Sequence, residues 1–176
     1  MTDRRADFTT RFALLARHEG VWDGHYRHFD AAGKAIDEHR SRLICRIPDS
    51  GPHDYVQTNY YSWADGRTEE RGFPAVAAGD RIKFESDLIN GWAASVTLDQ
   101  NRRTMMLHWE RVGEVGVYLY EMIQISDCGG YRARVWQWFR EGRLIQRTLI
   151  DEQRVSHEWR TLSGPSYAGD PIPEPA

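Results

Sequence analysis

Four side chains of this chain have the chemistry for proton transfer without a cofactor. Glu121 has apolar neighbours two residues away on either side, so an inward-facing Glu121 would lose solvation and gain a pKa suited to an acid or base. The imidazole of His108 could take the same role. Tyr60 could donate a hydrogen bond to a substrate, and Arg132 could stabilise developing negative charge. Together these groups predict an elimination, isomerisation or cyclisation.

Each of these residues also has a purely structural interpretation. Glu121 can form a salt bridge to Arg132 on the adjacent strand, and His108 can be a wall residue whose hydrogen bonds are satisfied. Tyr60 can simply fill the core. Alternation alone does not decide which face of a strand points inward.

Four further residues form the candidate ligand-binding set, namely Tyr26, His28, Arg134 and Trp136. Around residues 131–139, arginine and tryptophan alternate with other residues, so Arg134 and Trp136 share a face with Arg132. If that face is inside, its cations and flat rings suit an anionic or phenolic aromatic molecule. In the alternative, the arginines are solvated and the tryptophans line an outer wall or a homodimer contact.

Several functional templates are absent from the sequence. There is no phosphate-cradling glycine loop, no dinucleotide fingerprint and no Gly-x-Ser-x-Gly elbow, so no cofactor is predicted. His25 and His28 lie at odd spacing on one strand and point to opposite faces, so the spacing predicts no metal site. Cys45 and Cys128 are too few for a disulfide framework and are expected to be free thiols.

Charge and hydropathy limit the partners. The formal net charge is -3 without a basic run, which argues against a nucleic-acid partner and against an anionic membrane surface. Residues 1–10 are polar where a signal peptide needs an apolar core, and no apolar run reaches the length of a membrane span. A cytoplasmic location is expected, with a small molecule as the partner.

The elements that would position these residues are almost all strands. Residues 7–18 have Phe8, Phe12 and Leu15 on one stripe and predict a short helix that Asp7 caps. After Gly20, turn signals recur at short intervals and separate ten β-rich segments. These lie at about 20–29, 35–47, 54–63, 67–73, 80–89, 91–98, 103–112, 116–126, 130–140 and 143–155.

Ten hairpin-connected strands predict an all-β fold, a single antiparallel up-and-down barrel with the helix capping one end. The barrel domain is expected over residues 1–159. Residues 160–176 are rich in proline and glycine and are expected to form a loose C-terminal tail.

A short stretch, Gly20-Val21-Trp22, opens the first strand after the helix and resembles the Gly-x-Trp signature of the calycin superfamily, which includes the lipocalins. In that superfamily a basic residue of the last strand covers the tryptophan. The resemblance implies that Arg154 covers Trp22 as the first and last strands pair, with a gain of about 0.5–2 kcal/mol from the cation over the ring.

Further segments resemble a calycin-like family best represented in cyanobacteria and related to the bilin lyases that load phycobiliproteins. The likeness runs over most of residues 12–155 and implies the fold more firmly than an activity. It is carried by His18 to Tyr26, Gln57 to Gly66, Arg132 to Gln137 and Leu149 to Val155. Neither cysteine stands where a pigment could be attached covalently, so a pigment-loading role is not inferred.

The sequence therefore predicts a barrel whose cavity holds a small aromatic or hydrophobic molecule with polar groups and transforms it by acid–base chemistry of the lyase or isomerase type. The alternative is a carrier or chromophore chaperone of the lipocalin type that releases its ligand unchanged. A third hypothesis is a module that binds a partner through an exposed aromatic wall.

Overall fold

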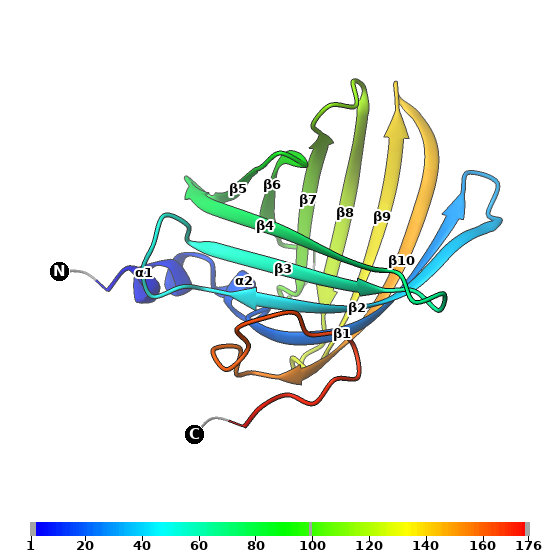
Figure 1. The fold of residues 1–176 in the computed structure, drawn as a ribbon. Coiled ribbons are helices and arrows are strands. Elements are labelled where there is room, and N and C mark those ends of the chain that lie inside the picture. Colours follow the sequence, from blue (N-terminus) through cyan, green and yellow to red (C-terminus); the bar gives the residue numbers. More distant parts are fainter. Residues whose placement is uncertain (1–2, 99, 175–176) are drawn as a thin grey trace.

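The computed structural model, which describes residues 3–98 and 100–174, is a closed barrel of ten antiparallel strands (Figure 1). Each strand pairs with its neighbours in sequence, and β1 pairs with β10 to close the barrel. The all-β, up-and-down architecture is thus confirmed. The strands are β1 (Gly20–Asp30), β2 (Ala35–Arg46), β3 (Tyr55–Ser62), β4 (Thr68–Ala78), β5 (Arg81–Glu85), β6 (Ile89–Val96), β7 (Thr104–Arg111), β8 (Val117–Ile125), β9 (Tyr131–Arg140) and β10 (Arg143–Ser156).

One turn was misplaced by the sequence pattern. Asn90-Gly91 was expected to separate two strands, but both residues lie inside β6, and the preceding turn is formed around Ser86 instead. The Ser86 hydroxyl accepts hydrogen bonds from the backbone N–H groups of Leu88 and Ile89. Gly91 is needed for another reason: a Cβ there would lie 2.0 Å from the carbonyl oxygen of His108 on β7. The glycine permits close strand approach rather than a turn.

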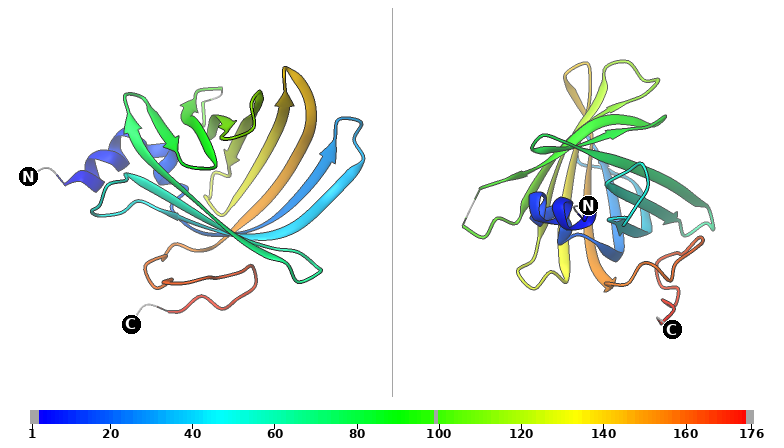
Figure 2. Two further views of the ribbon diagram at one scale, coloured as in Figure 1. Left: turned by 45° about the horizontal axis from the view of Figure 1, so that its top comes forward. Right: turned by 90° about the vertical axis from the view of Figure 1, so that its left-hand side faces the viewer.

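The N-terminal helix is split in two, α1 (Arg4–Arg11) and α2 (Ala13–Ala16), and begins earlier than expected. Asp3, rather than Asp7, caps α1 by accepting hydrogen bonds from two backbone N–H groups. The predicted apolar stripe of Phe8, Phe12 and Leu15 is buried. Both helices lie at one end of the barrel (Figures 1 and 2), which is called the closed end below.

The contact between the first and last strands is confirmed. Trp22 is opposite Arg154 in the β1–β10 ladder, and the guanidinium carbon lies 4.4 Å from the centre of the indole ring. Arg154 also donates to the backbone carbonyls of Arg17, Glu19 and Gly129, while the Trp22 indole N–H donates to the carbonyl of His18 at 2.8 Å. These bonds attach the helix end and the β8–β9 loop to the seam of the barrel.

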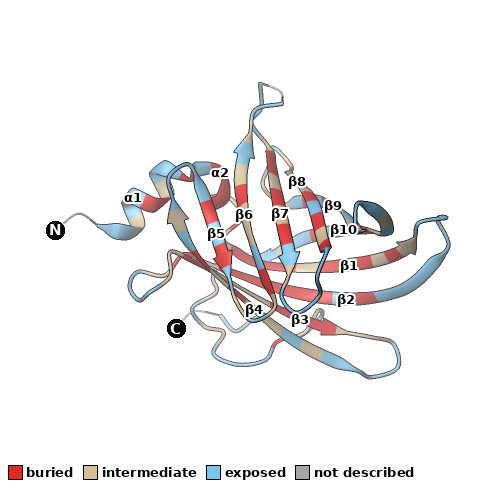
Figure 3. Cartoon of the chain, turned by 90° about the horizontal axis from the view of Figure 1, so that it is seen from above, coloured by how far each residue is buried: buried red, intermediate tan, exposed pale blue. Residues whose placement is uncertain are grey.

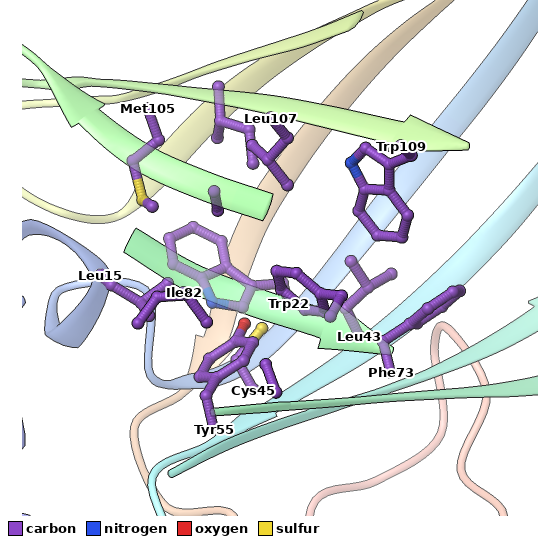
Figure 4. Packing of buried hydrophobic residues seen from close by; sticks show 14 of the residues in the cluster. Leu15, Trp22, Leu43, Cys45, Tyr55, Phe73, Ile82, Met105, Leu107 and Trp109 are labelled. Carbon is purple, nitrogen blue, oxygen red and sulfur yellow. The ribbon is translucent and has the colours of Figure 1, made fainter. Parts of the chain in front are cut away.

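The apolar core fills the closed half of the barrel. Figure 4 shows Leu15 of the helix, Trp22 of β1, Tyr55 of β3 and Met105 of β7 gathered around one centre. Burial alternates along the strands, so that buried bands are separated by intermediate or exposed ones (Figure 3). This alternation is the period of two that a sheet with one inner and one outer face must show.

The C-terminal segment is not loose, contrary to expectation. Within residues 157–174 it runs along the outside of the barrel, below β1–β3 in Figure 1. Tyr167 packs edge-on against Tyr60 with 5.8 Å between ring centres, and Ser166 accepts a hydrogen bond from buried Arg42 at 2.7 Å. Proline excludes this segment from the sheet ladder, but not from covering an apolar outer patch.

In the described part of the chain, none of the helices combines the length and the apolar character that crossing a membrane requires.

Candidate functional site in the barrel interior

The register of the barrel decides which predicted residues share the interior. Trp22 points into the barrel. Leu43 of β2 is opposite Trp22, and Asn59 of β3 is opposite Leu43, so both of these side chains also point inside. A second inner row continues across the closing strands through His28, Thr148, Trp136 and Glu121, each opposite the next. The ladder therefore places Glu121 and Trp136 on one row, a juxtaposition that no single strand reveals.

Two candidate catalytic residues lie outside the barrel, so their expected position was wrong. Tyr60 is opposite Arg42, one residue out of step with inward Asn59, and is covered by the C-terminal segment. His108 is opposite Tyr120 on the outer wall, where its ring lies 5.0 Å from that of Tyr120. A shift of one residue along a strand reverses the face, so neither side chain reaches the interior.

The other predicted residues lie inside, and three of them, Glu121, Arg132 and Arg134, are charged. Arg134 is almost fully buried, and its Nε donates to Glu121 Oε1 at 2.5 Å while its Nη1 donates to Glu152 Oε1 at 3.1 Å. Arg132 binds the second oxygen of Glu152. The alternative in which these arginines are solvated is thereby excluded. The salt bridge of Glu121 is to Arg134 rather than to Arg132.

Glu152 of β10 joins the two arginines inside the barrel. Gly24, opposite it on β1, leaves the space: a Cβ at Gly24 would lie 2.7 Å from Glu152 Cγ. Tyr26 completes the network by accepting a hydrogen bond from Arg134 at 3.2 Å. Burial raises the pKa of Tyr26 well above its usual range, although the charge of Arg134 opposes the rise.

Arg132 lies at the closed end of the network, away from open space. Its guanidinium carbon is 4.3 Å from the centre of the Trp22 ring, so the indole receives two cations, Arg132 and Arg154. His18 Nδ1 lies 3.3 Å from Arg132 Nη1. Burial, reinforced by the charge of Arg132, holds the pKa of His18 well below its usual range, so this imidazole is neutral at pH 7.

A small void, called the deep void here, lies between the network and the other end of the barrel. Its volume is about 40 Å³, enough for a few water molecules. The side chains around it include Asn59, Arg71, Trp109, Glu121, Arg134, Trp136 and Trp138.

Several polar atoms around the deep void lack a partner. The indole N–H groups of Trp109, Trp136 and Trp138 and the Oε2 atom of Glu121 are buried without a hydrogen bond to any part of the chain that the structure describes. Leaving a buried polar group unpaired costs about 1–3 kcal/mol. The four side chains that carry these three donors and one acceptor all line the deep void.

A larger pocket of about 190 Å³, called the mouth pocket here, opens beyond the deep void at the end opposite the helices. The two share Tyr61, Arg71 and Trp136 as lining residues. Tyr26 and His28 also line the mouth pocket. Burial is the main reason that the pKa of His28 is lowered to about 4, and the nearby His39 adds to the effect. Burial also lowers the pKa of His39.

Several residues of these cavities were missed in the sequence. The alternation pattern did not show whether Trp109 and Tyr61 point into the barrel or away from it. The inward position of Glu152 could have been predicted, because Glu152 is two residues from Arg154 and so lies on the same face of β10. His39 lies diagonally across the β1–β2 hairpin from His28, because His28 is opposite Asp37 and His39 is opposite Tyr26. This register follows an irregularity between His28 and Phe29, for which the sequence carries no signal.

Comparisons with known proteins give a fold and not a function. No protein-family model matches the chain, and no curated protein matches its sequence. A solved structure of the S-type phycobiliprotein lyase CpeS from Guillardia theta superposes with a TM-score of 0.61 at 14% identity, covering 81% of this chain and 90% of the lyase. The chain therefore has a barrel fold similar to that of this phycobiliprotein lyase. The predicted resemblance is confirmed at this level.

A second solved structure has the same fold within a longer chain. A protein of unknown function from Nostoc punctiforme, of the DUF3598 family, superposes with a TM-score of 0.57 at 15% identity, over 80% of this chain. The match covers 49% of the Nostoc protein, so the chain spans about half the length of that relative. At such low identity, both likenesses concern the backbone and not the cavity chemistry.

Proposed function

We propose that the barrel binds a small planar molecule that carries carbonyl-type acceptors together with an acidic O–H or N–H group. The observation that carries this proposal is the set of unpartnered polar atoms around the deep void, three indole N–H donors and the free oxygen of Glu121. An acceptor-bearing ring would receive the indole hydrogen bonds, and an acidic hydrogen would satisfy Glu121. The surrounding tryptophans offer flat surfaces for stacking.

The ligand ring is proposed to occupy the mouth pocket and to direct its polar end toward the deep void. The deep void, at about 40 Å³, is too small for an aromatic ring, whereas the mouth pocket, at about 190 Å³, is not. Trp136 lines both cavities and is the residue that such a ligand meets at their junction. This arrangement favours a ligand smaller than the large pigments of the phycobiliproteins.

Binding is tested with 7-hydroxycoumarin, a fluorescent planar molecule that has both a carbonyl and a phenolic O–H. We expect saturable binding, and Trp136→Phe should raise the Kd about tenfold, because it removes one hydrogen-bond donor worth about 1–1.5 kcal/mol. Trp92→Phe is the matched control, since Trp92 lies on the outer face of β6 beneath Arg81. Absence of saturable binding, or equal effects of the two substitutions, would contradict the proposal.

Acid–base chemistry by Glu121 is the second candidate function. It is favoured by one observation: Glu121 Oε1 is held by Arg134 while Oε2 is buried, unpartnered within the described residues and adjacent to the deep void. A carboxylate so placed can accept a proton from a bound acid. The non-catalytic carrier uses the same cavity but requires no proton exchange with Glu121.

The two candidates differ in the protonation state of the bound probe. The phenol and phenolate forms of 7-hydroxycoumarin have different excitation spectra, so their ratio can be measured in the complex. With Glu121 accepting the phenolic hydrogen, Glu121→Gln should change that ratio while retaining binding. An unchanged ratio would remove Glu121 as the acid–base group and leave the carrier function, and the binding proposal would stand.

A further inference from the structure

Outside the arginine–glutamate network, three metal-ligating side chains meet at the mouth of the barrel. His28 lies near the end of β1, and Asp37 and His39 lie near the start of β2, which is the adjacent strand. One nitrogen of each imidazole and one carboxylate oxygen of Asp37 all lie within 4.8 Å of one another. Two imidazoles and a carboxylate form a common protein ligand set for divalent transition metals.

The geometry points to a site for a divalent transition-metal ion, of which Zn²⁺ is the reference, held by His28, Asp37 and His39. The proposal does not depend on the ligand of the deep void. It assigns to this corner of the mouth pocket a function that the spacing of His25 and His28 along β1 did not suggest, since the missing ligands come from β2.

The two imidazoles carry free nitrogens. The Nε2 atoms of His28 and His39 are both buried, and neither has a hydrogen-bond partner in the described ranges 3–98 and 100–174. An imidazole nitrogen that is withdrawn from water and left unpaired is costly, and a metal ion would satisfy the Nε2 atom of His28.

The partners of the Nδ1 atoms decide which nitrogens a metal could use. His28 Nδ1 lies 3.0 Å from Thr148 Oγ1 and 2.9 Å from the Gln146 amide nitrogen, which can only donate. Binding through His28 Nε2 would therefore require the Gln146 amide to turn its carbonyl oxygen toward Nδ1–H, with Thr148 as a second acceptor. His39 Nδ1 lies 3.4 Å from Asp37 Oδ2, which is close to the separation of two ligand atoms on one tetrahedral ion. His39 Nδ1 and Asp37 are therefore the pair that would share the ion on the β2 side.

The surroundings restrict the rings but leave room for adjustment. The two imidazoles stack at 5.1 Å between ring centres, and Tyr26 stacks on His39 at 4.8 Å. Donor atoms around a tetrahedral ion at about 2.0–2.1 Å are about 3.3 Å apart, so binding would draw the most distant of these atoms together by up to about 1.5 Å. Asp37, which accepts a hydrogen bond from the Trp63 indole at 3.0 Å, is the most exposed of the three.

The remaining coordination positions would face the mouth pocket. His28, Asp37 and His39 all line it, together with Tyr61 and Trp136. An ion with three protein ligands keeps a position for water or for a small molecule, which is the pattern of open rather than structural zinc sites.

The site is tested with the full chain after treatment with a chelator, by titration with Co²⁺ followed in visible absorption and by competition with Zn²⁺. We expect one Co²⁺ per chain with the intense absorption of a four- or five-coordinate ion. His39→Gln should abolish this signal, and Asp37→Asn should weaken Co²⁺ binding at least tenfold, roughly the loss seen when a ligand or its supporting group is removed.

The matched control is the neighbouring pair on the outer face of the same two strands. His25 and Glu38 lie 2.5 Å apart there, so His25→Gln should leave Co²⁺ binding unchanged. If His39→Gln does not fold, the exposed Asp37→Asn variant carries the test. Absence of stoichiometric Co²⁺ binding, or loss of binding in His25→Gln with retention in Asp37→Asn, would overturn the site.

Discussion

The two ends of the barrel interior use similar residues in opposite ways. At the closed end, Trp22 donates to a backbone carbonyl, and Arg154 donates to three. At the mouth end, the indoles of Trp109, Trp136 and Trp138 have no acceptor among the residues described. Both ends are rich in tryptophan and arginine, so composition does not distinguish them. Hydrogen-bond satisfaction of these indole N–H groups does, and His18 Nε2 is the buried atom of the closed-end cluster that has no partner in the described residues.

This difference separates a structural kernel from a candidate binding site. Buried polar groups whose hydrogen bonds are all formed (a saturated cluster) stabilise one arrangement of the chain. Buried polar groups without partners (an unsaturated cluster) destabilise the fold, and a ligand that supplies the missing hydrogen bonds can remove that destabilisation. The arginine–glutamate network lies between the two ends. Glu152 belongs to the saturated side, because both of its oxygens are bound, and Glu121 belongs to the unsaturated side, because one oxygen is free.

The largest expected difference is in the tryptophans. Trp22→Ala should lower the free energy of unfolding by about 3–5 kcal/mol, because a fully buried indole and its contacts with Arg132 and Arg154 are lost. Trp138→Ala, at the partly open end, should cost less than about 2 kcal/mol. Urea denaturation followed by far-ultraviolet circular dichroism measures both. Equal costs would mean that the two ends do not differ as structural elements.

The second largest difference is expected between substitutions of the two buried glutamates, Glu152 and Glu121. Glu152→Gln should lower the free energy of unfolding by about 3–5 kcal/mol, because Arg132 and Arg134 are then left buried with one carboxylate between them. Glu121→Gln should cost about 1–2 kcal/mol, since Arg134 keeps Glu152 and Tyr26. Urea denaturation measures the free energy of unfolding of both variants. A larger loss for Glu121→Gln than for Glu152→Gln would mean that Glu121, and not Glu152, is the more important structural residue.

The smallest expected effect is on pH dependence. Because burial depresses the pKa of His18 in the folded state, the unfolded chain takes up a proton below about pH 6.5 that the folded chain does not. Stability should therefore fall as the pH drops below about 6.5, with His18 contributing up to about 1.4 kcal/mol per pH unit. Above that pH, both states hold a neutral imidazole and the contribution is constant.

Thermal melts across pH 5–8 measure this slope. His18→Gln should make the acid side of the profile flatter, and His25→Gln, on the outer face of β1, should leave the profile as it is. Identical slopes in wild type and His18→Gln would show that His18 is solvated in the closed end.

Sequence patterns predicted much of the fold because the signals involved are local. Turn residues separated ten strands within a few residues of their observed bounds, and Asn90-Gly91 misled only because a glycine can serve close packing as well as a turn. Trp22 and Arg154 were paired correctly because the resemblance to the calycins implied the contact, and closure of an antiparallel barrel brings the two terminal strands together.

The candidate site was predicted only in part. Glu121, Arg134 and Trp136 were identified by residue type, and the structure places them around the deep void. Tyr60 and His108 have equally suitable chemistry but lie on the outer face. Chemistry is a property of the residue, whereas the face depends on one residue of register, and a barrel fixes register only when all its strands are paired.

The amino-acid sequence by itself determined the all-β fold, the number and order of the strands, and the concentration of aromatic and charged residues in β8 and β9. Tertiary structure decided which of those residues face one another, brought Glu152 between two arginines, and set His28 beside Asp37 and His39. The reason is that alternation assigns the residues of a strand to two faces but does not say which face points inward. Only closure of the barrel decides which face lines the interior.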